Sequence, residues 1–167
     1  MKRKFILFFM MFGLVFKSIA CNTDNKTTSE EAFTVEATDT IKLTAGSTTF
    51  TATLANNSSA KALKELLTKG DIQIKMSDYG NMEKVGTLGT TLPRNDEHIT
   101  TAPGDLILYQ GNAFVIYYAP NTWTFTRLGK INNVSSDELI AALGKGDITV
   151  TLSLSAMQEA YETGNNF

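Results

Sequence analysis

The 167-residue chain has few of the residues on which common catalytic and metal sites depend. It holds one cysteine and one histidine, which excludes an intrachain disulfide. A catalytic zinc usually needs three protein ligands. The lone His98 follows Asp96 and Glu97 directly, and such neighbours point in different directions on a strand. The nucleophile motif Gly-x-Ser-x-Gly is also absent. We therefore expect neither a metal site nor a cofactor.

The N-terminus has the pattern of a secretory signal. Lys2, Arg3 and Lys4 precede an apolar run over residues 5–16, and small residues follow before the only cysteine. A basic start, a short apolar core and a small residue before the cleavage point are typical of export signals. The apolar run is shorter than a transmembrane helix requires. We predict that residues 1–20 are a signal peptide of the lipoprotein type.

Cys21 stands where a bacterial lipobox has its lipidated cysteine, and the surrounding segment resembles such a motif. Ser18 occupies the place that is usually leucine, so ordinary signal cleavage and an uncleaved anchor remain alternatives. With a lipid on Cys21, the protein would be exported and held at the membrane of a bacterial cell envelope. The polar residues 21–33 would then be a flexible tether.

The mature chain is acidic. Loss of the signal segment removes four cations, Lys2, Arg3, Lys4 and Lys17, and changes the formal net charge from −2 to −6. No cluster of Lys and Arg remains, which argues against a nucleic-acid partner. The length fits one domain, which we place at residues 34–155 with a tail at 156–167.

The chain contains an internal repeat. The first copy, residues 49–77, reads TFTATLANNSSAKALKELLTKGDIQIKMS. The second copy, residues 124–153, reads TFTRLGKINNVSSDELIAALGKGDITVTLS. Each has an alternating segment, Asn-Asn, Ser-Ser, a helical pattern, Lys-Gly-Asp-Ile and another alternating segment, which predicts two related strand–helix–strand units. If the repeats build the scaffold, the unrepeated residues 78–123 are where we expect the function.

The remaining patterns predict a mainly β fold. Helices are expected at residues 58–67 and 135–143, the second with Ser135 and Glu138 in capping-box spacing. Alternating segments predict strands, whereas residues 83–101 are the least regular stretch. The strands are expected within residues 33–54 (with a turn at 45–47) and at 72–76, 106–109, 113–118, 125–131 and 148–154. Closure into a barrel of about eight strands, with two short capping helices, would remove exposed edges.

Residues 105–143 resemble the cyclophilin-like barrel superfamily through a Gly-Asp pair, a strand hairpin and Leu-Gly-Lys-Ile before a helix. The segments MSDYGNMEKVGTL, GDLILYQGNAFVIYY, TFTRLGKI and GKGDITVTL together resemble a bacterial family of cyclophilin-like lipoproteins of unassigned activity. The resemblance covers roughly residues 41–154. It implies a cyclophilin-like closed β-barrel.

The resemblance also raises prolyl isomerase activity as an alternative function. In active cyclophilins an arginine before the Gly-Asp pair donates hydrogen bonds to the substrate carbonyl. Arg94 lies eleven residues before Asp105, which is the matching spacing. The accompanying phenylalanine and glutamine fall on Ile99 and Ala102, and the active-site histidine falls on Phe125, so these are not kept. Arg94 is therefore the one catalytic candidate, and a solvated turn arginine is the competing interpretation.

Aromatic residues near the 119–121 loop predict a groove for a small ligand or a peptide. Tyr117 and Tyr118 are consecutive, so one of them faces the core and the other faces outward. Glu83 with Lys84 and Asp78 are candidates for an acid–base pair, or else a solvated strand edge. The predicted function is a non-catalytic binding module, and a partner-binding protein with a flat apolar patch is a further alternative. The predicted ligand-binding residues are Glu83, Arg94, Tyr109, Tyr118 and Trp123.

Overall fold

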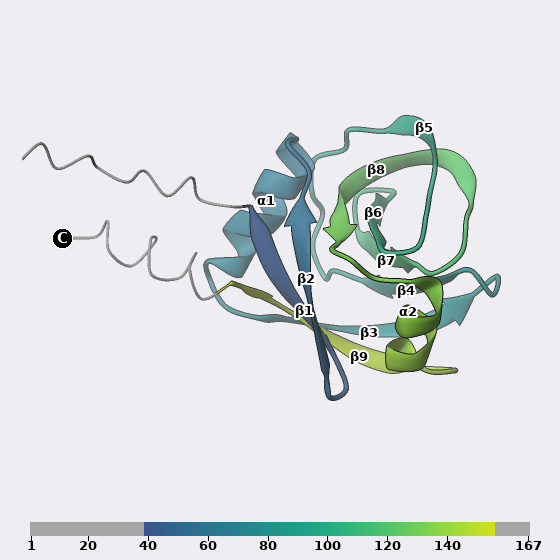
Figure 1. Cartoon of the computed structure of the whole chain (residues 1–167). Coiled ribbons are helices and arrows are strands. Elements are labelled where there is room, and N and C mark those ends of the chain that lie inside the picture. The colour runs from purple at the N-terminus through teal and green to yellow at the C-terminus, as the bar shows by residue number, and fades with distance from the viewer. Residues whose placement is uncertain (1–38, 156–167) are drawn as a thin grey trace, which may run out of the picture. The chain divides into compact units, whose positions relative to one another are not determined.

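The computed structural model describes residues 39–155 (Figure 1). The predicted signal peptide, the lipidation site Cys21, the tether at 21–33 and the tail at 156–167 lie outside the described residues. Within residues 39–155, no helix has the length and apolar character needed to cross a membrane.

The described residues form nine strands and two helices. The strands are β1 (Thr40–Ala45), β2 (Thr48–Leu54), β3 (Ile72–Tyr79), β4 (Glu83–Thr87), β5 (Glu97–Thr100), β6 (Asp105–Tyr109), β7 (Ala113–Tyr117), β8 (Thr122–Ile131) and β9 (Ile148–Leu154). The helices are α1 (Ser58–Leu67), between β2 and β3, and α2 (Ser136–Leu143), between β8 and β9.

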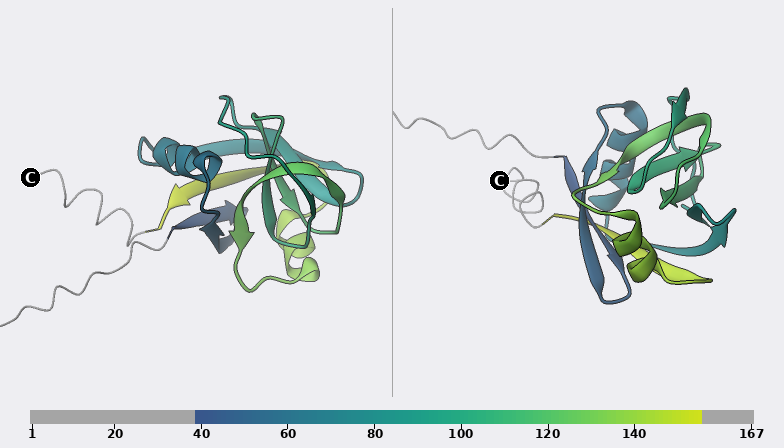
Figure 2. Two further views of the ribbon diagram at one scale, coloured as in Figure 1. Left: turned by 90° about the horizontal axis from the view of Figure 1, so that it is seen from above. Right: turned by 45° about the vertical axis from the view of Figure 1, so that its right-hand side comes forward.

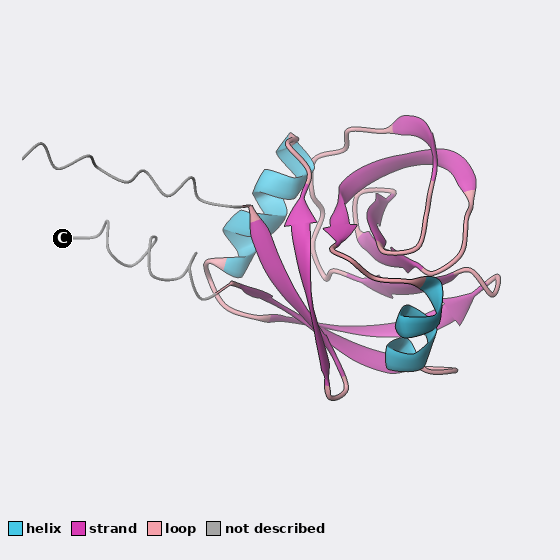
Figure 3. Ribbon diagram, viewed as in Figure 1, coloured by secondary structure: helices cyan, strands magenta, loops and turns pink. Residues whose placement is uncertain are grey.

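Eight of the strands close into an antiparallel barrel, as predicted. Their order is β2-β1-β9-β3-β4-β7-β6-β8, and β8 pairs back onto β2. β5 pairs with the N-terminal half of β8 and stands outside the closed ring. Figure 3 shows the strands surrounding a common centre, with the two helices set apart from each other. Closure pairs the backbone N–H and C=O groups that the edge strands of an open sheet would expose.

The two repeats form matching strand–helix–strand units and pair with each other. The first unit is β2, α1 and β3, and the second is β8, α2 and β9. β2 runs antiparallel to β8, and β3 runs antiparallel to β9. Ile74 lies opposite Val150, its own counterpart in the other repeat. Ile72 lies opposite Leu152, which is the counterpart of Met76, so the pairing is reciprocal as around a local two-fold axis.

Both predicted helices are confirmed, and so is the predicted capping box of the second helix. Asn57 is the N-cap of α1, where its side chain accepts a hydrogen bond from the Ala60 amide and donates one to the Arg127 carbonyl. Ser135 caps α2 in a capping box with Glu138. These side chains satisfy amide groups that have no partner inside a helix. The Asn57 contact with β8 also fixes α1 to the barrel.

The structure corrects the expected strands in one region. Residues 83–101, predicted to be irregular, contain β4 and β5. β4 has no simple alternation of polar and apolar residues because Glu83 and Lys84 are both buried. Strands β3 and β8 are also longer than predicted, since β3 continues to Tyr79 and β8 begins at Thr122. These extensions are held by pairing with β4 and β5.

The barrel has two hydrophobic clusters because β6 and β7 are buried on both faces. Leu106, Leu108, Phe114 and Ile116 point to the main core inside the barrel. The alternate residues of the same strands point outward to a second cluster, formed by Ile107, Val115, Tyr117 and Phe125. β8 is strongly curved (Figures 1 and 2) and carries Phe125 onto this outer face. The second cluster is the floor of the candidate site.

Candidate functional site

A cavity of about 460 Å³ lies over the second cluster, and we call it the aromatic pocket. Five of its nine lining residues carry aromatic rings, and one is a carboxylate. The lining residues are Tyr79, Glu83, Val85, Tyr109, Val115, Tyr117, Asn121, Trp123 and Phe125. All but Phe125 belong to the unrepeated residues 78–123. The pocket thus lies where the two repeats leave the barrel asymmetric.

Strand register gathers these side chains on one face. Glu83 of β4 lies directly opposite Tyr79 on β3 and Tyr117 on β7. Two residues further along β4, Val85 lies opposite Val115. Residues that are two apart on a strand, and those directly opposite on its neighbours, share a face of the sheet. Glu83 is therefore held in a cross-strand row between two tyrosines.

Glu83 is a buried carboxylate with one hydrogen-bond donor from a side chain. Only 8% of the residue is exposed. Burial raises the pKa of Glu83 above its ordinary value of 4.5, and the hydrogen bond from the Tyr117 hydroxyl partly offsets this rise in pKa. No ion pair within residues 39–155 includes Glu83. The pocket wall thus contains an acidic group without a protein counter-charge.

Tyr117 connects Glu83 to the 119–121 loop. Its hydroxyl donates to Glu83 and accepts a hydrogen bond from Asn121 Nδ2 at 3.2 Å. Burial, followed by the neighbouring Glu83, raises the pKa of Tyr117 well above the ordinary tyrosine value, so the phenol stays protonated near neutral pH. Asn121 is itself held by Thr101, whose hydroxyl accepts a hydrogen bond from the backbone N–H of Asn121 at 2.9 Å. The polar end of the pocket is therefore preorganised.

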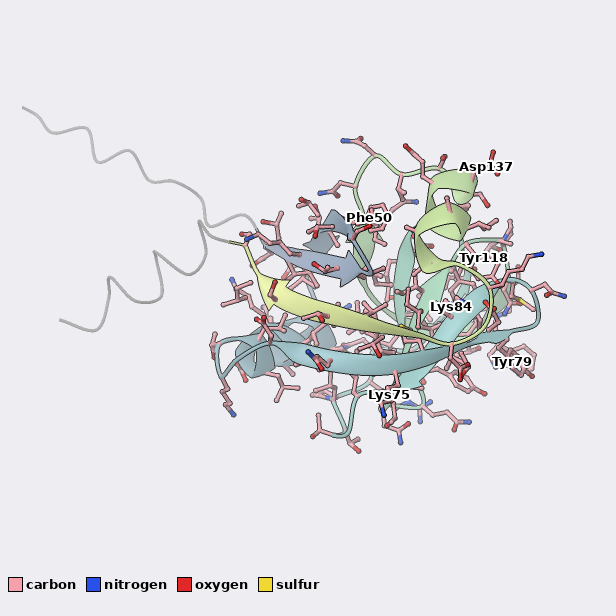
Figure 4. All side chains as sticks on the ribbon, turned by 90° about the horizontal axis from the view of Figure 1, so that it is seen from below. Phe50, Lys75, Tyr79, Lys84, Tyr118 and Asp137 are labelled. Carbon is pink, nitrogen blue, oxygen red and sulfur yellow. The ribbon has the colours of Figure 1, made fainter. Side chains whose placement is uncertain are left out.

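The aromatic rings differ in depth. Phe125 is buried, with its ring centroid 5.6 Å from that of Tyr117 and 6.2 Å from that of Tyr109 in an edge-on arrangement. Tyr79 and Trp123 are 65% and 60% exposed and form the rim. Figure 4 shows Tyr79 projecting from the edge of the molecule. A ligand would thus meet exposed rings first and buried rings at the floor.

The five predicted ligand-binding residues do not share one cavity. Glu83, Tyr109 and Trp123 line the aromatic pocket. Arg94 lies outside its lining, in the loop between β4 and β5, where it forms an ion pair with Asp96. Its side chain is 56% exposed, although it is near enough to Tyr109 to interact electrostatically.

Tyr118 lies at a different cavity. Its hydroxyl donates to Asp78 Oδ1 at 3.2 Å, on the side of the barrel that carries α2 (Figure 4). That second cavity, which we call the α2 cavity, has a volume of about 420 Å³. It is lined by Asp78, Asn81, Tyr118, Ile140, Leu143, Gly144 and Lys145. Of the consecutive tyrosines, Tyr117 rather than Tyr118 reaches the aromatic pocket.

The candidate acid–base pair of Glu83 with Lys84 and Asp78 is not present, and the alternative of a solvated strand edge is wrong for Glu83 and Lys84, because both are buried. Lys84 is fully buried on the opposite face of β4, where its Nζ lies 2.7 Å from Asp78 Oδ1 and donates to the Gly146 carbonyl at 2.5 Å. The hydrogen bond from Lys84 lowers the pKa of Asp78 below its ordinary value. Lys84 donates to the Gly146 carbonyl and Asp78 accepts from the Gly146 amide, and these two hydrogen bonds join the β3–β4 hairpin to the segment after α2. Glu83, on the other face of β4, is left without a cationic neighbour in the pocket lining.

The predicted ligand-binding residues did not include six of the nine lining residues: Tyr79, Val85, Val115, Tyr117, Asn121 and Phe125. A usable signal was the predicted strand at 113–118, because the two faces of a strand alternate and Val115 therefore shares a face with Tyr117. Among residues 39–155 there is also no group of three or more His, Cys, Asp or Glu side chains suited to hold a metal ion.

The fold and the motifs agree with a known protein family. A model of the Cyclophilin-like family matches residues 43–153. The chain belongs to this family. The expected cyclophilin-like barrel is thereby confirmed, while the lipoprotein part of the expectation stays a prediction. The Gly-Asp and Leu-Gly-Lys-Ile motifs meet in this barrel, because Asp105 lies opposite Lys130, and Leu106 opposite Gly129.

Two solved structures resemble the cyclophilin-like barrel. McbB, determined in complex with tryptophan, has a TM-score of 0.51 and 19% sequence identity, covering 70% of this chain and 45% of McbB. This chain thus corresponds to less than half of McbB. The solution structure of the hypothetical protein AF2241 from Archaeoglobus fulgidus has a TM-score of 0.54 and 11% identity, covering 71% of this chain and 96% of AF2241. At these identities the likeness concerns the fold. No curated protein matches the chain.

Proposed function

We propose that this cyclophilin-like protein is a binding module that holds a small molecule, or a single peptide side chain, in the aromatic pocket. The observation that carries the proposal is a cavity of about 460 Å³ that combines a buried carboxylate with five aromatic rings. Binding sites for small ligands are typically clefts of ~300–1,000 Å³ with apolar walls and a few fixed polar groups.

The arrangement of the pocket supports binding more directly than its size does. Tyr117 and Asn121 hold the polar end in place before any ligand arrives. Trp123 and Tyr79 leave large aromatic surfaces exposed at the rim of this cavity, where a ligand could bury them. McbB, which has a similar fold, was determined in complex with tryptophan. A protein that shares this fold over part of its length is thus known in complex with a small molecule.

The proposal is tested by screening a set of small molecules of mixed charge against the full-length protein with ligand-observed NMR. Trp123→Ala removes a rim ring without disturbing the core, because the residue is 60% exposed. We expect it to weaken binding of the retained compounds about tenfold, as truncation of an aromatic anchor commonly does. Ile140→Ala is the matched control, since Ile140 is exposed at the α2 cavity.

The same screen can contradict the proposal. Compounds that bind Trp123→Ala normally but Ile140→Ala weakly would place binding at the α2 cavity instead. Absence of binding by compounds of every charge would remove the support for a binding module altogether.

Prolyl isomerisation is the weaker alternative. Arg94, its one catalytic candidate, is paired with Asp96 and lies outside the lining of the aromatic pocket. If the protein accelerated isomerisation of a proline peptide in an NMR exchange assay, Arg94→Ala should abolish that acceleration. Retention of activity in this variant would exclude the cyclophilin arrangement as its source.

We further propose that the module is held at a bacterial cell envelope by a lipid on Cys21. The support is the sequence of residues 1–21, with its basic start, apolar core and cysteine. In cells fed a palmitate analogue, the protein should become labelled, and Cys21→Ala should remove the label. Equal labelling of both forms would contradict lipidation at this cysteine.

A further inference from the structure

We propose that the aromatic pocket takes a small organic cation, with a protonated primary amine beside Glu83 and an apolar body among the aromatic rings. This inference rests on the proposed binding function and adds the chemical class of the ligand. Its starting point is charge. Of the nine lining residues, Glu83 is the only one with a carboxylate, and none is Lys, Arg or His.

Within residues 39–155, no cation pairs with Glu83. The neighbouring Lys84 points to the opposite face, where Asp78 and the Gly146 carbonyl hold its amine. Arg94, which interacts electrostatically with Tyr109, is paired with Asp96. A buried carboxylate without a counter-charge is unfavourable, and a ligand that supplies the charge relieves this cost. The electrostatics therefore favour a cation over an anion or a neutral molecule.

Glu83 also has free hydrogen-bonding capacity. A carboxylate has two oxygens with about four acceptor positions. The Tyr117 hydroxyl uses one of these positions. The side-chain amide of Asn121 donates to Tyr117 rather than to Glu83. A primary ammonium carries three donors, which suits the acceptor positions that remain. Hydrogen bonds between such ionised groups are stronger than those between neutral groups.

The walls of the pocket suit the rest of such a ligand. Tyr79 and Trp123 at the rim, with Tyr109 and Phe125 further in, present aromatic rings around the carboxylate. Aromatic faces attract cations and also bury apolar groups. In an amine attached to an aromatic or aliphatic body, the ammonium group would therefore pair with Glu83 and the apolar body would contact the aromatic rings. An anionic ligand would meet Glu83 without a balancing cation.

The experiment uses three probes of nearly the same shape on the full-length protein: phenethylamine, phenethyl alcohol and hydrocinnamate. Trp123 is the only tryptophan of the chain, so its fluorescence reports on the rim of the pocket. We expect the amine to bind about tenfold or more tightly than the alcohol, the difference typical of one charged hydrogen-bonded contact. The carboxylate probe should bind least.

Glu83→Gln keeps the shape of the side chain and removes its charge, so it should bring the amine and the alcohol to similar affinities. Glu65→Gln, on the exposed surface of α1, is the matched control and should keep the preference. Equal binding of amine and alcohol by the unmodified protein would overturn the inference, and so would a preference that survives in Glu83→Gln.

These outcomes separate the two proposals. If the alcohol or the carboxylate probe binds in a Trp123-dependent manner while the amine has no advantage, the pocket is a binding site and only the cation assignment fails. If none of the three probes binds and the wider screen also finds no ligand, both proposals fail. The comparison of amine and alcohol needs only the unmodified protein, so it remains decisive even if Glu83→Gln folds poorly.

Discussion

Glu83 couples the chemistry of the pocket to the stability of the fold. Because burial raises its pKa above 4.5, the folded protein keeps the proton over a pH range in which the unfolded chain has already released it. The free energy of unfolding therefore falls as the pH rises through that range. The ionisable groups that line the pocket with Glu83 are the phenols of Tyr79, Tyr109 and Tyr117, none of which supplies a positive charge.

Glu83→Gln should accordingly stabilise the protein at about pH 7, by an amount within the ~0.5–3 kcal/mol usual for single substitutions. The gain should shrink toward about pH 3, where the wild-type carboxyl is protonated in both states. Urea unfolding of both proteins across this pH range measures the difference. Other carboxyls, such as Asp78 with its lowered pKa, contribute equally to both proteins and cancel. A gain that grows as the pH falls would contradict the raised pKa.

At the scale of elements, hairpin register and helix caps put the site together. Gly80 and Asn81 both have positive φ, which permits the tight turn that sets Tyr79 opposite Glu83. A slip of one residue would turn Glu83 to the other face and Lys84 into the pocket. Asn57 acts similarly between elements, because it caps α1 and donates to the Arg127 carbonyl of β8 at 2.8 Å.

Asn57→Ala should therefore cost more than the loss of a simple helix cap. We expect destabilisation of about 1–2 kcal/mol from the lost cap and the lost hydrogen bond to β8. Chemical unfolding of Asn56→Ala provides the control, since Asn56 is the exposed neighbour with the same side chain. Equal stabilities of the two variants would show that the Asn57 contacts contribute nothing.

For the molecule as a whole, the decisive contact is the closure of the barrel between β2 and β8. Gly129 lies opposite Leu54 at this seam. A Cβ atom on Gly129 would lie 2.4 Å from the Thr53 carbonyl oxygen, too close for any side chain. The same strand carries Trp123 and Phe125 to the aromatic pocket at its other end. One strand, β8, therefore both closes the barrel and contributes two residues to the aromatic pocket.

Gly129→Ala should push β8 away from β2 and destabilise the protein by about 1–3 kcal/mol or more, as overpacking does. The matched control is Gly46→Ala, because Gly46 has a φ of +58° and open space around it. That variant adds only the strain of an alanine in the left-handed conformation, about 1–2 kcal/mol. Thermal unfolding that ranks Gly46→Ala as the more damaging change would contradict the steric role of Gly129.

Much of the barrel was predictable, because its signals are local. The capping residues of α2, the 110–112 turn and the alternation in β9 each report on a few consecutive residues. β4 was missed because its two charged residues are buried for different reasons: Lys84 by an ion pair with Asp78, and Glu83 by the pocket. Neither reason is visible without the neighbouring strands.

Some residues of the candidate site could likewise be predicted from the sequence, and others could not. Glu83, Tyr109 and Trp123 were predictable as chemistry, since the sequence shows an acid and aromatics in the unrepeated segment. The choice between Tyr117 and Tyr118 was not, because alternation gives two faces without saying which one the barrel encloses. Arg94 had the right spacing from Asp105, but its ion pair with Asp96 and its exposed position depend on how the β4–β5 loop folds.

The repeat, the two helices and most of the strands could be predicted from the sequence, because caps, turns and alternation act over short distances, and the closed barrel followed from the family resemblance. Three features depend on the folded barrel: the reciprocal pairing of the repeats, the ion pair of Lys84 with Asp78, and the position of Glu83 among five aromatic rings. The physical reason is register: which residues lie opposite one another follows from closure of the whole barrel, not from any one strand.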